Sequence, residues 1–162
     1  MFPKNEKLLD LTEFNNSPEQ PIRSEFCRVI RIIDGDTIVV NNGSKNEKVR
    51  FIGINTPETV DPKSPIERYG KEASAFTRRM LEGKKVRLEY DIQQRDKYLR
   101  LLAYVYLENG QMFNRMLVEE GYAQAMTVPP NIKYQQDFIR LERKARENNK
   151  GLWNSPPAPL LK

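Results

Sequence analysis

The chain has 162 residues, with 27 Lys or Arg, 22 Asp or Glu, no histidine and one cysteine. This length fits one domain with its own core and is too short for two ordinary domains. The lack of histidine excludes Ser/His and Cys/His catalytic pairs and imidazole-based zinc sites, so catalysis must depend on carboxylates, Arg, Lys, Tyr or a hard metal ion. Cys27 cannot form an internal disulfide, and we expect it to pack as a small apolar side chain.

The formal net charge of +5 indicates an anionic partner, with nucleic acid the first candidate and a membrane surface the second. Residues 1–26 hold three basic and five acidic side chains, so the positive excess belongs to the remainder. These residues show no apolar core of a signal peptide, and no stretch of the chain approaches the roughly 20 apolar residues of a membrane span. We therefore expect a soluble protein with a polar N-terminal arm at residues 1–25.

Clusters of β-branched residues between turn formers predict strands at residues 26–33, 37–40 and 48–54. Asn42-Gly43 is a hairpin signal between the second and third of them. These three segments predict an antiparallel meander. Residues 85–90 and 99–107 predict two more strands.

Helices are predicted where apolar residues recur at spacings of three and four. The segments are residues 69–81, 113–121 and about 132–148. Five strands and three helices without parallel βαβ alternation predict an α+β fold, a five-stranded OB-fold β-barrel with three α-helices, one of them closing an end of the barrel. This domain is expected at residues 26–153, with a C-terminal tail at 154–162.

Asp34-Gly35-Asp36-Thr37, between the first two strands, is the first candidate site. One interpretation is a turn in which Asp side chains accept hydrogen bonds from backbone N–H groups. The other is a tight turn that presents a carboxylate to a hard cation such as Ca²⁺. The motif by itself does not separate the two.

Arg50 and the segment 55–58, Asn-Thr-Pro-Glu, form the second candidate site. Alternate residues of a strand share a face, so Arg50 is expected beside Ile52 and Ile54. That position is costly for a guanidinium unless an anion meets it. The alternative is a surface charge followed by an ordinary turn.

The third candidate is the segment 95–100, Arg-Asp-Lys-Tyr-Leu-Arg. It can be a solvated charged loop. It can also be a phosphate cradle, in which Arg100 binds two phosphate oxygens with its planar guanidinium and Tyr98 supplies a hydroxyl or a ring for base stacking.

These motifs together resemble one known family. VIRIIDGDTIVV, VRFIGINTPET, ERYGKEASAFTRRML, DKYLRLLAYVY, NGQMFNRMLVEEGYA and GLW occur in the order and approximate spacing of the staphylococcal nuclease family. The resemblance covers residues 26–153. It implies an OB-fold barrel with three helices that cleaves DNA and RNA with Ca²⁺ and leaves 3′-phosphate ends.

The resemblance also implies roles for single residues. Asp36 and the backbone carbonyl of Thr56 correspond to Ca²⁺ ligands, and Glu58 to the general base that acts on the attacking water. Arg50 and Arg100 correspond to the two arginines that bind the scissile phosphate.

Substrate contacts are expected from Lys97 and Tyr98, which flank the nucleotide pocket, and from Lys63 and Tyr122. Thr127 replaces a tyrosine that covers the nucleotide base in the best-known member, so Tyr122 or Tyr134 is expected to supply base contacts instead.

Asn55 departs from the family pattern, because the family has a second metal carboxylate at this position. An amide oxygen can still bind Ca²⁺, but the site loses one negative charge, and ligand charge is a main control on Ca²⁺ affinity. Weaker or altered Ca²⁺ dependence is the expected consequence.

Two functional hypotheses follow. The first is a monomeric Ca²⁺-dependent nuclease for DNA and RNA, preferring single-stranded or denatured substrate and without a membrane partner. The second is a nuclease-like nucleic-acid-binding module whose catalysis is weakened by Asn55. A basic OB module that binds single strands without metal leaves the Thr-Pro-Glu cluster unexplained. The family resemblance favours a secreted protein, although the first 26 residues contain no recognisable signal.

Overall fold

The computed structural model describes residues 26–58 and 69–154. Five strands form a closed barrel in the order β1 (Phe26–Asp34), β2 (Thr37–Asn41), β3 (Asn46–Phe51), β6 (Leu101–Tyr106) and β5 (Lys85–Glu89). With its three α-helices, the barrel confirms the predicted α+β fold class. The predicted arm at 1–25 and residues 155–162 of the predicted tail lie outside the described residues.

Strand pairing follows the predicted meander. β1, β2 and β3 pair antiparallel in sequence, and β5 pairs antiparallel with both β1 and β6. β3 and β6 are parallel neighbours, and their pairing closes the barrel. The hairpin between β2 and β3 turns at Asn42-Gly43, where Gly43 has a φ of 99° and the Asn42 side chain accepts backbone hydrogen bonds.

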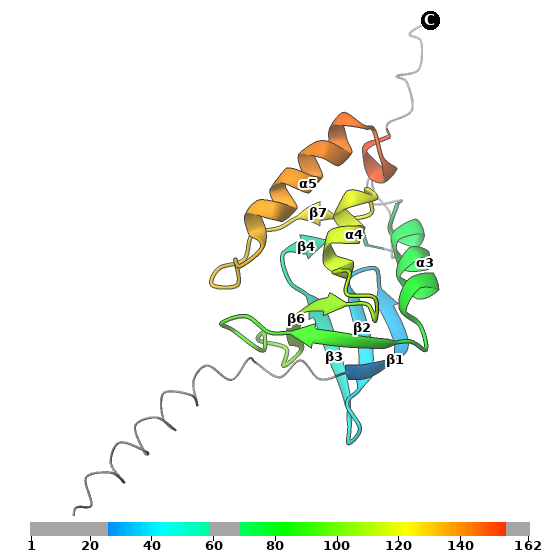
Figure 1. Ribbon diagram of the computed structural model, residues 1–162, viewed down its shortest axis with the longest axis vertical. Coiled ribbons are helices and arrows are strands. Elements are labelled where there is room, and N and C mark those ends of the chain that lie inside the picture. The colour runs from blue at the N-terminus through cyan, green and yellow to red at the C-terminus, as the bar shows by residue number, and fades with distance from the viewer. Residues whose placement is uncertain (1–25, 59–68, 155–162) are drawn as a thin grey trace, which may run out of the picture.

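The helices are α3 (Gly70–Leu81), α4 (Phe113–Glu119) and α5 (Gln135–Glu147), followed by a short 3₁₀ turn at Gly151–Trp153. All three were predicted, with ends that differ by three residues or fewer. Figure 1 shows the helices gathered on one side of the barrel, while the β2–β3 hairpin projects from the opposite end. Within the described part of the chain, no helix has the length and apolar character needed to cross a membrane.

The predicted strand at 48–54 was wrong as a single element. β3 ends at Phe51, and Ile54–Asn55 forms a separate strand, β4, that pairs with β7 (Gln124–Ala125) in a second small sheet. Gly53 makes the break, because its φ of 80° is strained for other residues and a Cβ there would lie 2.5 Å from the Phe138 ring. The alternation that placed Ile52 and Ile54 on the face of Arg50 therefore does not extend beyond Phe51.

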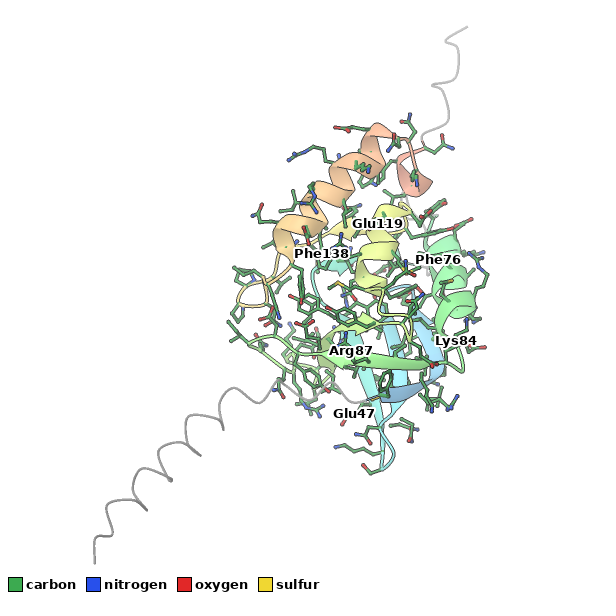
Figure 2. All side chains as sticks on the ribbon, in the orientation of Figure 1. Glu47, Phe76, Lys84, Arg87, Glu119 and Phe138 are labelled. Carbon is green, nitrogen blue, oxygen red and sulfur yellow. The ribbon has the colours of Figure 1, made fainter. Side chains whose placement is uncertain are left out.

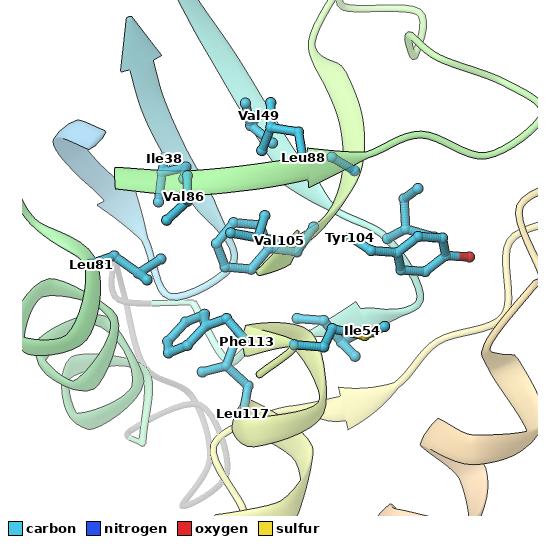
Figure 3. Packing of buried hydrophobic residues seen from close by; sticks show 14 of the residues in the cluster. Ile38, Val49, Ile54, Leu81, Val86, Leu88, Tyr104, Val105, Phe113 and Leu117 are labelled. Atoms are coloured by element: carbon cyan, nitrogen blue, oxygen red, sulfur yellow. The ribbon is translucent and has the colours of Figure 1, made fainter. Parts of the chain in front are cut away.

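The hydrophobic core fills the barrel and continues to α4, as Figure 3 shows. Val49, Leu88 and Val105 are fully buried inside the barrel, and Phe113 of α4 is fully buried against them. Each such side chain contributes about 1.5–3 kcal/mol through burial. Cys27 is also buried, as predicted.

Asn114 ties α4 to the strand break. It is fully buried, its Nδ2 donates to the Ile52 carbonyl at 2.9 Å, and its Oδ1 accepts from the Val105 N–H at 2.9 Å. A buried polar side chain that satisfies backbone groups on two segments fixes their separation. Asn114 thus holds the β3–β4 corner in place, just ahead in sequence of the candidate segment 55–58.

Candidate functional site

The turn after β1 holds the Asp36 carboxylate in a buried position where each of its oxygens accepts a hydrogen bond. Asp36 Oδ2 accepts from the Thr56 N–H at 3.0 Å, and Oδ1 accepts from the Thr37 hydroxyl at 2.9 Å. From α3, the buried Thr77 hydroxyl donates to the Gly35 carbonyl at 2.7 Å. A Cβ at Gly35 would lie 2.9 Å from Thr56 Oγ1, so glycine allows the turn to pack against Thr56. These contacts confirm a turn conformation and also present the carboxylate to the end of β4.

Arg50 is almost enclosed by protein, since its side chain is only 13% exposed. Its Nη1 donates to the carbonyls of Phe51 at 2.7 Å and Ile54 at 3.0 Å. Its Nη2 donates to Asn55 Oδ1 at 3.2 Å and lies 3.4 Å from Asp36 Oδ2. The guanidinium thus spans the β3–β4 corner and joins it to the Asp36 turn.

Burial lowers the pKa of Arg50 below its usual value, and the Asp36 carboxylate opposes that shift. The positive charge of Arg100 lowers the same pKa further, so the two guanidinium groups repel each other. Two positive charges that the fold holds close enough to repel each other stabilise an anion that binds between them.

The residues around Asp36 supply ligand atoms of the type that a hard cation prefers, but they would bind it only with modest affinity. The Asp36 carboxylate, the Asn55 amide oxygen and the Thr56 carbonyl are all oxygen donors, which Ca²⁺ prefers. The buried Thr56 hydroxyl has no hydrogen-bond partner within residues 26–58 and 69–154, a state that an additional polar group or ion would relieve. Across those same ranges no three Asp, Glu, Cys or His side chains converge on a metal position. The donor set therefore fits a cation but carries little charge for holding it.

Arg100 enters the site from the loop between β5 and β6. Its Nε donates to Asp96 Oδ2 at 2.8 Å, and its guanidinium lies 5.5 Å from the centre of the Tyr98 ring. Asp96 Oδ1 accepts the backbone N–H groups of Tyr98 and Arg100, each at 3.0 Å. Leu99, with a φ of 66° and 73% exposure, completes this tight turn.

Two contacts fasten this loop to its surroundings. Arg95 pairs with Glu47 of β3 through two hydrogen bonds of 3.0 Å each, and Figure 2 shows Glu47 at the end of the barrel away from the helices. The hydrogen bonds from Arg95 are the main reason that the pKa of Glu47 falls to about 2. Two residues before Arg95, the Gln93 backbone and the Asn131 side chain exchange two hydrogen bonds of 2.8 Å. The part of the loop that precedes Arg100 is thus anchored to two other segments of the chain.

A cavity of about 230 Å³ brings Arg50 and Arg100 together. The two arginines and Asp96 supply its charged groups. The rest of its wall comes from the β3–β4 corner, from β6 and from two loops, as Phe51, Ile52, Gly53, Gln93, Leu102, Met126, Val128 and Asn131. A lining that combines two cationic side chains with several apolar ones suits a ligand with an anionic part and an apolar or aromatic part.

Apart from Arg50 and Arg100, none of the predicted site residues that the structure describes lines this cavity, the proposed cation donors Asp36, Asn55 and Thr56 included. Lys97 and Tyr98 are exposed on the Arg100 loop, with Lys97 Nζ 5.1 Å from the centre of the Tyr98 ring. Glu58 is exposed three residues after Asn55 and is not among the cavity-lining residues. Lys63 lies outside the described residues.

Tyr122 and Tyr134 occupy positions away from the cavity. The Tyr122 ring stacks on Phe76 of α3 with centroids 4.4 Å apart and also stacks with Tyr69, with centroids 5.5 Å apart. The Tyr134 hydroxyl bonds both carboxylate oxygens of Glu89 at 2.9 Å. Neither tyrosine lines the cavity, where Met126 and Val128 contribute side chains instead.

Sequence reasoning missed several residues of the cavity wall. Met126, Val128 and Asn131 belong to a segment with no strand or helix periodicity, so no pattern marked them. Asp96 offered a better signal, because Asp often accepts backbone N–H groups two residues ahead in a turn. Its four-residue spacing from Arg100 also permits an ion pair.

Comparison with known proteins adds an independent finding. The family model described as staphylococcal nuclease homologue matches residues 48–155. The thermonuclease of Staphylococcus hyicus is 49% identical over 128 residues, which cover 79% of this chain and 75% of that protein. The thermonuclease of Staphylococcus intermedius is 46% identical over 132 residues, which cover 82% and 78%.

A relative from another genus shares the same region. The endonuclease YncB of Bacillus subtilis is 40% identical over 126 residues, which cover 76% of this chain and 59% of that protein. The closed five-stranded barrel, the three helices and these matches agree, and the chain belongs to the staphylococcal nuclease family.

Proposed function

We propose that this protein is a Ca²⁺-dependent nuclease that hydrolyses DNA and RNA and leaves 3′-phosphate ends. The observation that carries the proposal is the cavity in which Arg50 and Arg100 meet beside the Asp36 turn, in a member of a nuclease family. A phosphodiester has one negative charge in the ground state and develops more in the transition state, so two fixed guanidinium groups favour the transition state. We further propose that the protein acts as a monomer, with residues 26–153 as its nuclease domain.

The two arginines have different parts in this proposal. The Nη atoms of Arg50 already bond the Phe51 and Ile54 carbonyls and Asn55, so Arg50 contributes mainly a fixed positive charge. Arg100 bonds Asp96 through Nε, so its Nη groups are the ones that would donate to the phosphate oxygens.

Glu58 is the proposed general base. It takes a proton from the attacking water, the water oxygen bonds to phosphorus, and the bond from phosphorus to the 5′ oxygen breaks. The departing 5′ oxygen takes a proton from solvent, which leaves a 3′-phosphate and a 5′-hydroxyl. The exposed position of Glu58 gives it access to water.

Asp36, Asn55 and the Thr56 carbonyl would hold the Ca²⁺ ion, which supplies Lewis-acid polarisation of the phosphate when bound. With Asn55 in place of a carboxylate, the protein would need more Ca²⁺ than a site with two carboxylates.

Lys97 and Tyr98 are the proposed substrate contacts beside Arg100, because their exposed cation and ring suit a nucleic-acid backbone and an unstacked base. An unstacked base is available in single strands, so denatured DNA and RNA are the preferred substrates in this proposal. Lys63 and Tyr122 are further proposed substrate contacts, on the family resemblance alone.

A second candidate function is a nucleic-acid-binding module with little catalysis. Asn55 favours it, because the proposed metal donors include one carboxylate and the Asn55 oxygen already accepts from Arg50. This module would retain the cationic cavity and the charge that attracts nucleic acid.

The test is cleavage of denatured and duplex DNA and of RNA in millimolar Ca²⁺, in EGTA, and with Mg²⁺ or Mn²⁺ replacing Ca²⁺. The proposal expects cleavage in Ca²⁺ that EGTA abolishes, faster on denatured DNA, with 3′-phosphate ends. No cleavage at any Ca²⁺ concentration, with binding retained in a gel-shift assay, would refute the enzyme and favour the binding module.

A further inference from the structure

The Arg100 side chain is only 29% exposed, yet most of its N–H groups have no hydrogen-bond acceptor among the described residues. Among the residues that the structure describes, its side chain makes one hydrogen bond, from Nε to Asp96 Oδ2 at 2.8 Å. A guanidinium has five N–H donors in one plane, so four remain on Nη1 and Nη2. Arg100 lines the cavity and keeps the edge that bidentate phosphate binding requires.

Asp96 controls the direction of that edge. One of its carboxylate oxygens holds the Nε of Arg100, and the other accepts the backbone N–H groups of Tyr98 and Arg100 at 3.0 Å each. The Asp96 N–H also donates to the Arg100 carbonyl at 3.1 Å. The guanidinium plane is therefore fixed relative to the backbone of its own loop.

The next two side chains of the loop offer limited further support for this plane, although the Tyr98 ring centre lies 5.5 Å from the guanidinium. Tyr98 is 67% exposed and Leu99 is 73% exposed, so neither side chain buries much of the loop. Arg95 and Gln93 anchor the earlier part of the loop but do not bond the Arg100 side chain. Within the described chain, Asp96 is the hydrogen-bonding group that sets the orientation of Arg100.

The charge of Asp96 also suits this role. Although partial burial raises the pKa of Asp96, the side-chain and backbone hydrogen bonds from Arg100 lower it below its usual value. The carboxylate is therefore ionised at neutral pH. Its charge favours the ionised form of Arg50 as well, which moderates the repulsion between the two arginines when no anion lies between them.

We propose that Asp96 is a positioning residue for the nuclease reaction, which holds the Nη1 and Nη2 edge of Arg100 toward the scissile phosphate. This inference rests on the proposed function, since it needs a phosphate in the cavity. Asp96 acts through Arg100 and does not itself touch the reacting atoms. A role limited to folding the loop is the alternative that the experiment must separate.

The experiment is a double-mutant cycle of Asp96→Asn and Arg100→Ala, with kcat and KM measured on denatured DNA at saturating Ca²⁺. The Asn amide oxygen can still accept the two backbone N–H groups, but the charged bond to Nε is lost. A misplacement near 1 Å can cost about 100-fold in rate, so Asp96→Asn is expected to lower kcat by about 10- to 100-fold with little change in KM. With Arg100→Ala already present, the same change should cost less than about twofold, because the group that it positions is gone.

Asp137→Asn is the matched control, since Asp137 is also a partly buried Asp that bonds arginines, Arg140 at 2.7 Å and Arg115 at 3.3 Å. It lies on α5 and is expected to leave kcat unchanged. Arg100→Lys is a second variant, which keeps the charge but loses the Nε–H group that Asp96 holds. It should lose at least as much kcat as Asp96→Asn.

Equal losses from Asp96→Asn with and without Arg100 would overturn the inference and assign Asp96 to loop folding alone. A near-normal kcat for Arg100→Lys would overturn it too, because charge without orientation would then suffice. No cleavage by the unmodified protein would refute the proposed function, and the inference with it. If the unmodified protein cleaves DNA but Asp96→Asn costs the same kcat with and without Arg100, only the role of Asp96 is refuted and the proposed function stands.

Discussion

Replacing Arg50 or Arg100 by Ala should have different effects on stability, because Arg50 also anchors the fold whereas Arg100 mainly serves the phosphate site. Arg50→Ala removes the donor from two carbonyl oxygens and the partner of the buried Asp36 carboxylate. Breaking a buried ion pair by removing one partner costs about 3–5 kcal/mol. We therefore expect the free energy of unfolding to fall by about that amount.

Arg100→Ala should have a much smaller effect on stability. Arg100 is 29% exposed, and Asp96 would keep two backbone hydrogen bonds after the substitution. Partly exposed ion pairs contribute about 0–1 kcal/mol. Each substitution should nevertheless lower kcat by about 10²–10³-fold, because each removes a cation from the phosphate site.

The assay is urea unfolding followed by the fluorescence of Trp153, the single tryptophan, together with kcat on denatured DNA. Unfolding free energies are comparable if the dependence on urea concentration stays the same in all variants. A stability loss below about 1 kcal/mol for Arg50→Ala, the bottom of the range for exposed pairs, would refute the buried anchoring role. Equal losses for both variants would also refute the distinction drawn between them.

Three further predictions concern carboxylates and their replacements. Asn55→Asp should lower the Ca²⁺ requirement and tighten Ca²⁺ binding in calorimetry without nucleic acid by about tenfold, because it adds a charged ligand. Asn46→Asp on the exposed β2–β3 hairpin makes the same change in net charge and should not, and equal affinities in both variants would contradict this. Glu58→Gln should slow kcat by about 10²–10⁴-fold with little change in substrate binding, and a near-normal kcat would exclude Glu58 as the base. The pKa of Glu47 is lowered from 4.5 to about 2 in the folded protein, so its ion pair stabilises the fold above pH 4.5 and loses that effect as pH falls toward 2. The stability difference between the unmodified protein and Glu47→Gln should therefore close over that range, and a difference that persists at pH 2 in urea titrations would contradict it.

The strands of the barrel could be predicted because the sequence patterns that mark them span only a few residues. Alternation of buried and exposed residues in β1 and β3, and the Asn42-Gly43 turn, are visible within a few residues of sequence. The break after Phe51 could not be predicted in the same way. Gly53 stands among apolar residues, and one reason for a glycine there is the close approach of Phe138, which is 85 positions away in the chain.

In the candidate site, too, the residues marked by local patterns could be predicted and those placed by distant contacts could not. Asp36 and Arg50 were singled out from local patterns, Asp36 from its turn motif and Arg50 from an alternation with Ile52 and Ile54 that the break after Phe51 interrupts. Another part of the cavity wall, with Met126 and Val128, comes from a loop that the hydrogen bonds between Asn131 and Gln93 help to hold in place. Tyr122 shows a related difficulty, since an aromatic residue near a predicted site can just as well stack in the interior, as this ring does on Phe76.

The anchored loop between β5 and β6 has a consequence for how substrate is bound. The Glu47–Arg95 pair and the Asn131–Gln93 bonds are contacts within the protein, so they order this loop without any contribution from substrate. Ordering a backbone residue costs about 1–2 kcal/mol of conformational entropy, and here folding, not substrate binding, carries that cost. The interaction energy between Arg100 and a phosphate is then available for affinity and rate, because little of it is needed to order the loop.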